Sequence, residues 1–301
     1  MTPGDSLREA AVGRLAAQWT ALGGQLDGPA ETHVVDLEAL LAATARLAPG
    51  EPRLVEAALA WSTRHGSAVN VARLRTVAAE LDATAEVAAL AAAVQRVGGL
   101  PWPSSRTNEG YRGPGPWDVI DPRPGLVVVR DLAGPARLVW RLRAGFGVNA
   151  RADILAALLA APALLSIADL ASRTRFGKRT VAGAVADMAL AGLADVERTG
   201  NADRVRLAEG APIRAWLPAP AGTARDEASR WRCVLAAIDL HDRIEGALDA
   251  VRAVEGRAAV DALRPALAAG GLPRPDSNVP GVAFATEVDA WLEALAAAVA
   301  P

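Results

Sequence analysis

Residues 149–207, NARADILAALLAAPALLSIADLASRTRFGKRTVAGAVADMALAGLADVERTGNADRVRL, carry the pattern that decides the fold of this chain. Apolar residues recur in the first part at intervals of three and four, which predicts a helix over 150–160 with Arg151 and Asp153 facing outward. Pro162 ends this helix, because proline cannot continue the backbone hydrogen-bond ladder. Ser166 is a favourable N-cap for a second helix over 167–173.

A third helix is predicted over 178–191, after a short turn through 175–177. Gly192 is placed to end it, since glycine readily takes the left-handed conformation found at helix C-termini. Its expected inward residues are Val181, Ala184, Val185 and Met188. Residues 196–207 then alternate apolar and charged side chains around a turn at 199–203, a pattern typical of two half-buried strands joined as a hairpin.

This order of elements resembles the winged helix-turn-helix of bacterial transcription regulators. The resemblance is carried by FGKRTV at 176–181 and MALAGL at 188–193, and it covers about a fifth of the chain. It implies that the start of the third helix faces the major groove of DNA, while the hairpin, or wing, touches the backbone or the minor groove. More loosely, WRLRAGFGVNAR at 140–151 is similar to uncharacterised winged-helix proteins encoded beside nucleotidyltransferase-like toxins, which implies an antitoxin-like or autoregulatory role.

A cluster of cations surrounds the turn before the third helix. It consists of Arg173, Arg175, Lys178 and Arg179, and no acidic residue lies between positions 170 and 186. Each phosphate that such cations neutralise releases condensed counterions, so the cluster predicts salt-sensitive binding to double-stranded DNA. The alternative is a solvated charged turn, although cations beside a helix N-terminus are disfavoured by the helix dipole and call for another reason.

Few side chains of the third helix could recognise a specific DNA sequence. The outward residues that follow in the third helix are Ala182, Gly183 and Ala186, which offer base edges no hydrogen-bond donor. Any sequence-specific contact would therefore come from Lys178, Arg179 and Thr180.

The hairpin adds three more candidate DNA-binding residues, Arg198, Arg204 and Arg206. Their guanidinium groups would bridge phosphates or enter a narrow minor groove. The acids Asp195, Glu197 and Asp203 lie in the same hairpin, so pairing across the strands is an equally good use of these arginines.

The composition of the chain and its Pro/Gly-rich segments predict how the remaining residues are organised. Its 301 residues are 51% hydrophobic and 22% charged, as in globular proteins, and the net charge of -2 means that any attraction to nucleic acid is local. We expect a mainly α fold with a helical domain at 1–100, a Pro/Gly-rich linker at 101–137, the winged helix at 138–215 and C-terminal helices at 224–301. Segments 126–129 and 138–142 alternate like short strands, and Trp102, Tyr111 and Trp117 are expected to pin the linker to a surface or stack on a nucleobase.

A long stripe of apolar residues follows the winged helix. Between 227 and 254 it recurs at steps of three and four, which predicts one helix long enough to pack across a domain or against a second copy of the chain. The stripe consists of Trp231, Val234, Ile238, His241, Ile244, Leu248, Val251 and Val254. The second alternative would give a homodimer through this helix, and the N-terminal helical domain is free to bind a protein partner.

Enzymatic interpretations fit the sequence poorly. GFGVNA at 145–150 matches a relaxed dinucleotide-binding pattern, but the preceding segment alternates with charge and no second strand follows the helix. His33, His65 and His241 lack acidic or cysteine neighbours at metal-ligand spacing, and Cys233 is better explained as a packed side chain than as a nucleophile. We expect no enzyme activity, catalytic residue, cofactor or metal.

The apolar runs are too short to span a membrane, and one cysteine with no N-terminal signal pattern favours the cytoplasm. Two functions remain from the sequence. The first is a DNA-binding transcriptional regulator. The alternative is a protein-interaction module or scaffold that has a winged-helix fold and does not bind DNA, because a fold alone does not determine a function.

Overall fold

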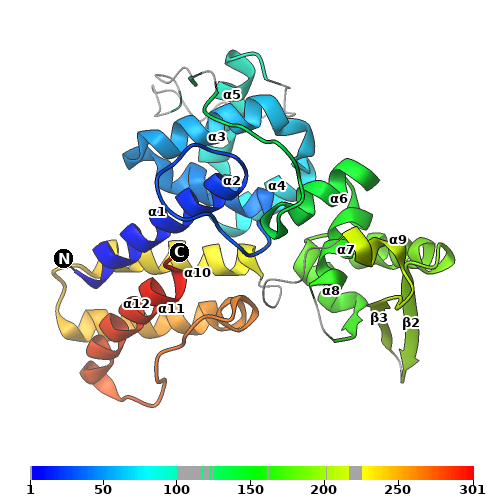
Figure 1. Ribbon diagram of the computed structural model, residues 1–301. Coiled ribbons are helices and arrows are strands. Elements are labelled where there is room, and N and C mark those ends of the chain that lie inside the picture. The colour runs from blue at the N-terminus through cyan, green and yellow to red at the C-terminus, as the bar shows by residue number, and fades with distance from the viewer. Residues whose placement is uncertain are drawn as a thin grey trace.

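The computed structural model describes residues 2–99, 117, 122–123, 125–160, 163–200, 202–216 and 226–301. It is mainly helical, with one small antiparallel sheet (Figure 1). The helices before the winged helix are α1 (Pro3–Ala21), α2 (Leu37–Leu47), α3 (Pro52–His65), α4 (Val71–Glu80), α5 (Thr84–Arg96) and α6 (Leu138–Phe146). Those after it are α10 (Glu227–Ile244), α11 (Asp249–Gly270) and α12 (Phe284–Val299).

The first and last helices of the chain share one hydrophobic core. Side chains of α1 to α5 and of α10 to α12 belong to a single buried cluster, and α1 packs against both α10 and α12. Figure 1 shows α1 lying beside these two C-terminal helices. We call this unit the helical body. The segments 1–100 and 224–301, expected as separate regions, are therefore two halves of one packed unit, and the winged helix is inserted between them.

The apolar stripe at 227–254 does not form one helix. It breaks after Ile244, and the chain turns through Gly246 (φ 72°) before α11 begins, so α10 and α11 pack on each other. Trp231, Val234 and Ile238 are buried inside the helical body, where they serve its core rather than a second copy of the chain. The part of the stripe left exposed is Leu248, Val251 and Val254.

Segment 138–142, expected as a strand, lies in helix α6 instead. Its alternation of apolar and charged residues suggested two faces, but Arg143 is buried as completely as Leu142. At 126–129, Val127 makes a single antiparallel bridge to Gly24. Trp117 is buried in the core of the helical body, whereas Trp102 and Tyr111 lie outside the described residues.

The winged helix has its own core and the predicted order of elements. Helices α7 (Ala150–Leu159), α8 (Ile167–Thr174) and α9 (Lys178–Leu190) pack with strands β1 (Leu165–Ser166), β2 (Ala194–Thr199) and β3 (Ala202–Leu207). Strand β3 is central and pairs antiparallel with β1 and β2, so that Val205 faces both Leu165 and Val196. Figure 1 shows this unit projecting from one side of the molecule, next to α6. The central winged helix-turn-helix with a hairpin wing is thus confirmed.

Local signals explain these boundaries. Ser166 and Asp169 form a reciprocal capping box at the start of α8. Gly192 has φ 69° directly after the last turn of α9, as expected of a glycine that ends a helix. Strand β1 is too short to show a period in the sequence, and only its pairing with β3 reveals it.

Candidate nucleic-acid interface

The start of α9 presents two uncompensated cations to solvent. Lys178 and Arg179 occupy its first two positions and are exposed, as is Thr180. The N-cap is Gly177, which has no side chain to accept hydrogen bonds from the first backbone N–H groups, and the first turn contains no acid. Among the residues that the structure describes, no carboxylate forms an ion pair with Lys178 or Arg179.

This arrangement is unfavourable unless an anion is present. The N-terminus of a helix carries a partial positive charge, so adjacent acids stabilise it and adjacent cations destabilise it. Free N–H groups and two cations at one helix end are instead the elements of a phosphate-binding site.

Arg175 differs from its neighbours in the basic cluster, because its side chain is 8% exposed and fully paired. Its Nε donates to Glu80 Oε2 (3.1 Å), its Nη1 to Asp226 Oδ2 (2.7 Å) and its Nη2 to Ser229 Oγ (3.1 Å). These partners belong to α4 and to the start of α10 in the helical body. In this structure Arg175 therefore joins the turn to the body and is not presented to DNA, contrary to the expectation from the sequence.

Arg173 and Arg204 are partly exposed near Asp169. Hydrogen bonds from Ser166 lower the pKa of Asp169, and the charges of Arg173 and Arg204 lower it further. These two cations are thus partly compensated by an acid while their side chains still reach solvent.

The wing is balanced in charge. Arg206 pairs with Asp195 (3.2 Å) and Glu197 (3.4 Å), and Arg204 lies opposite Glu197 across the strands. Arg198 lies opposite Asp203 but is exposed and forms no ion pair within the described part of the chain. Of the three wing arginines, Arg198 is the one best placed to contact a phosphate.

The outward face of α9 is small and apolar beyond its first turn. Ala182, Gly183 and Ala186 are exposed, and Leu190 is 90% exposed at the end of the helix. Asp187 pairs with Arg151 of α7. This face can approach a surface closely, but apart from Asp187, which is paired with Arg151, it has no side chain that would hydrogen-bond to a base edge.

A buried ionic network fixes the winged helix on the helical body. Arg143 of α6 is fully buried and donates to Glu38 of α2 (2.6 Å) and Asp153 of α7 (3.0 Å). Arg73 of α4 donates from Nε to the carbonyl oxygen of Thr174 (2.9 Å), at the end of α8, and its Nη1 binds Asp36 (2.6 Å). We call Asp36, Glu38, Arg73, Arg143 and Asp153 the junction network.

The junction network holds three acids and two arginines. Burial would raise the pKa of Asp36 and of Glu38, but the adjacent arginines outweigh it and lower both. Burial raises the pKa of Asp153 to about 6. Sequence reasoning placed Asp153 on an outward face, which is wrong because its partner Arg143 approaches from α6.

Outside this interface, we considered the single cysteine, metal-ligand clusters and membrane-spanning helices. Burial raises the pKa of the Cys233 thiol to about 12, so this side chain is not a poised nucleophile. The described residues contain no cluster of histidine, cysteine or acidic side chains that would hold a metal ion. None of the described helices combines the length and apolar character that crossing a bilayer requires.

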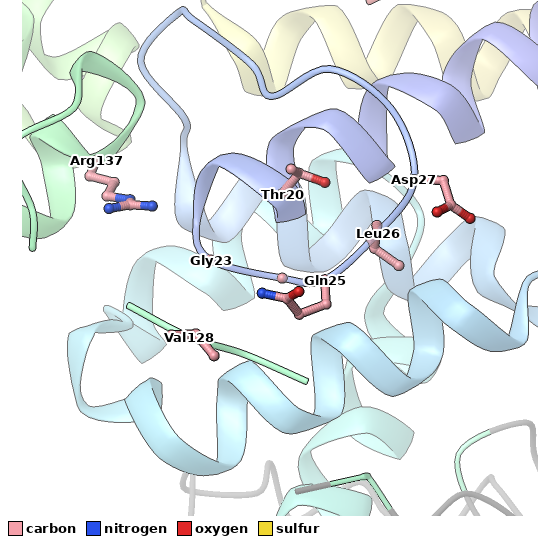
Figure 2. Close-up of a pocket in the computed structure, with 8 residues that line it drawn as sticks. Thr20, Gly23, Gln25, Leu26, Asp27, Val128 and Arg137 are labelled. Carbon is pink, nitrogen blue, oxygen red and sulfur yellow. The ribbon is translucent and has the colours of Figure 1, made fainter. Parts of the chain in front are cut away.

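A shallow depression lies on the helical body where the loop after α1 meets the segment before α6 (Figure 2). Arg137 contributes to its wall but already donates to the carbonyl oxygens of Ala21 and Asp131. The other lining residues are Thr20, Gly23, Gly24, Gln25, Leu26, Asp27 and Val128. None of them belongs to α8, α9 or the wing, so this depression is not part of the interface described above.

Comparison of the chain with protein-family models, curated proteins and solved structures found no match.

Proposed function

We propose that this protein binds double-stranded DNA through the winged helix and acts as a regulator of transcription. The observation that carries the proposal is the pair of exposed cations at the start of α9, which has no side-chain cap and whose cations form no ion pair with any acid that the structure describes. A phosphate at this helix end would accept hydrogen bonds from the free N–H groups and neutralise Lys178 and Arg179. Arg173, Arg198 and Arg204 supply further positive charge from α8 and the wing.

The contact chemistry supports binding with little sequence preference. Ala182, Gly183 and Ala186 bring methyl groups and backbone toward the groove and offer no donors to bases. Affinity would come mainly from phosphates, with Thr180 and the two cations as the only side chains near base edges. Binding would then depend steeply on salt.

The test is a salt titration of binding to a fluorescent duplex. We expect the wild-type affinity to fall steeply between ~50 and 200 mM salt, and the variant Lys178→Ala/Arg179→Ala to lose about two phosphate contacts, which lowers the log–log slope by about 1.8. The matched control is Arg243→Ala/Arg264→Ala, which removes the same charge from exposed positions of the helical body. Equal slopes for the two double variants would contradict the proposal.

The alternative, a protein-interaction module, has one observation in its favour. Leu190 is almost fully exposed beside the alanine-rich face of α9, a surface that suits a protein partner as well as a groove. Absence of duplex binding at ~50 mM salt and micromolar protein would favour this function over the first.

A further inference from the structure

We propose that the contact between Arg175 and the helical body is a latch that restrains DNA binding, and that phosphate competes with Glu80 and Asp226 for this arginine. The proposal rests on the DNA-binding function proposed above. It assigns to the helical body a regulatory role, which is to hold back one cation of the basic cluster until a polyanion is present.

The position of Arg175 in the chain is the first argument. It lies in the turn between α8 and α9, three residues before Lys178, and three residues span at most ~11 Å of extended chain. A phosphate bound at the start of α9 is therefore close to this side chain. In the structure Arg175 instead donates to Glu80, Asp226 and Ser229, which lie outside the winged helix. Its Nη1 also donates to the carbonyl oxygen of Ser172 in α8 (2.7 Å).

The backbone of Arg175 is the second argument. It has φ 58° and ψ 25°, the left-handed conformation at the end of α8, where glycine is usual because a Cβ atom is strained there. A non-glycine residue keeps this conformation when its surroundings hold it. Here the side chain of Arg175 is held by its ion pairs with Glu80 and Asp226 and by a hydrogen bond from Nη1 to the carbonyl oxygen of Ser172 (2.7 Å).

The nature of the contact is the third argument. The helical body and the winged helix have separate hydrophobic cores, and the bonds that Arg175 makes between them are all polar. Ion pairs of this kind exchange partners without exposing apolar core, and a phosphate offers the same bidentate geometry as a carboxylate.

The experiment is a double-mutant cycle on DNA affinity. Glu80→Gln removes one latch partner but leaves Asp226, whose side chain also caps α10 by accepting from the Ser229 backbone N–H. We expect Glu80→Gln to raise duplex affinity several-fold and to raise the salt slope by about 0.9, because Arg175 then contacts one more phosphate. In an Arg175→Ala background the same substitution should have a clearly smaller effect.

The control variant is Asp82→Asn, which removes an equal charge two residues from Glu80, at a position with φ 51° that asparagine tolerates. The latch predicts a larger gain for Glu80→Gln than for this control. If Glu80→Gln raises affinity no more than Asp82→Asn, or raises it equally with and without Arg175, the contact is a fixed strut and the latch is wrong.

The latch and the DNA-binding function fail in different ways. Sensitivity to Lys178→Ala/Arg179→Ala without coupling between Glu80 and Arg175 removes only the latch. Insensitivity to the double variant removes the DNA-binding function and the latch with it. Binding by Glu80→Gln alone, with none by the wild type, would support both.

Discussion

Two groups of basic residues in this molecule have opposite environments. In the junction network, Arg73 and Arg143 are buried and surrounded by carboxylates, and their ion pairs hold the winged helix on the helical body. At the start of α9, Lys178 and Arg179 are exposed, and within the described residues no acid pairs with them. The comparison teaches that a basic residue indicates a polyanion partner only when it is exposed and uncompensated. Arg175, next to one group in sequence, belongs with the other in space.

The largest expected effect on stability comes from removing Arg143, the most deeply buried arginine of the junction network. The variant Arg143→Ala leaves Glu38 and Asp153 as buried acids without their main partner, and breaking such a pair costs about 3–5 kcal/mol of unfolding free energy. Denaturant unfolding followed by circular dichroism measures the loss.

The matched control is Arg151→Ala. Arg151 also pairs with an aspartate, Asp187, but both side chains are about half exposed, and such surface pairs contribute about 0–1 kcal/mol. A similar loss of stability in the two variants would mean that burial does not determine how much an arginine–aspartate pair contributes to stability.

The second-largest expected effect is a pH dependence of the free energy of unfolding, which originates in Asp153 of the junction network. Because the folded-state pKa of Asp153 is raised to about 6 from 3.8, the folded protein binds a proton more tightly than the unfolded chain. Above pH ~6 the buried carboxylate is charged and lowers the free energy of unfolding. As the pH falls through that value the carboxylate is protonated, and at pH ~4.5 the free energy of unfolding is about 2 kcal/mol higher, from this group, than at neutral pH.

The measurement compares the wild type with Asp153→Asn at pH 7.5, 6 and 4.5. Burial lowers the pKa of His65, whose contribution falls as pH decreases through the ordinary histidine range, so only the difference between the two chains isolates Asp153. We expect the wild type to gain stability relative to the variant on acidification. A difference that stays constant over this range would exclude titration of Asp153.

The contrast also explains how far the sequence predicts this molecule. The winged helix follows from local signals, because the capping residue Ser166, the period of α9 and Gly192 all act within a few residues. The junction network does not, since Arg143 and Glu38 are 105 residues apart and nothing local distinguishes a buried arginine from an exposed one. The same limit accounts for Arg175, whose partner Asp226 lies 51 residues later in the chain.

The division of the 227–254 stripe has a related cause. The period of three and four continues through the break, although the stripe is buried in α10 and its last residues, Leu248, Val251 and Val254, are exposed. Only Gly246 marks the point where the chain reverses. The period alone therefore shows neither where the helix ends nor which part of the stripe is buried, and it does not show what covers the buried part, such as Trp231 and Ile238. A second copy of the chain and a neighbouring helix give the same pattern.

The smallest effect concerns the wing, where the comparison recurs within a single hairpin. Arg206 is held by Asp195 and Glu197, whereas Arg198 is exposed at the far end of β2. If exposure without compensation is what allows a cation to meet phosphate, Arg198→Ala should lower the salt slope of duplex binding by up to ~0.9 and Arg206→Ala by clearly less. Both variants should unfold within about 0.5 kcal/mol of the wild type, since both positions are on the surface. A larger loss of binding in Arg206→Ala than in Arg198→Ala would show that DNA displaces the wing's own acids, and pairing in the free protein would then be no guide to which arginines bind.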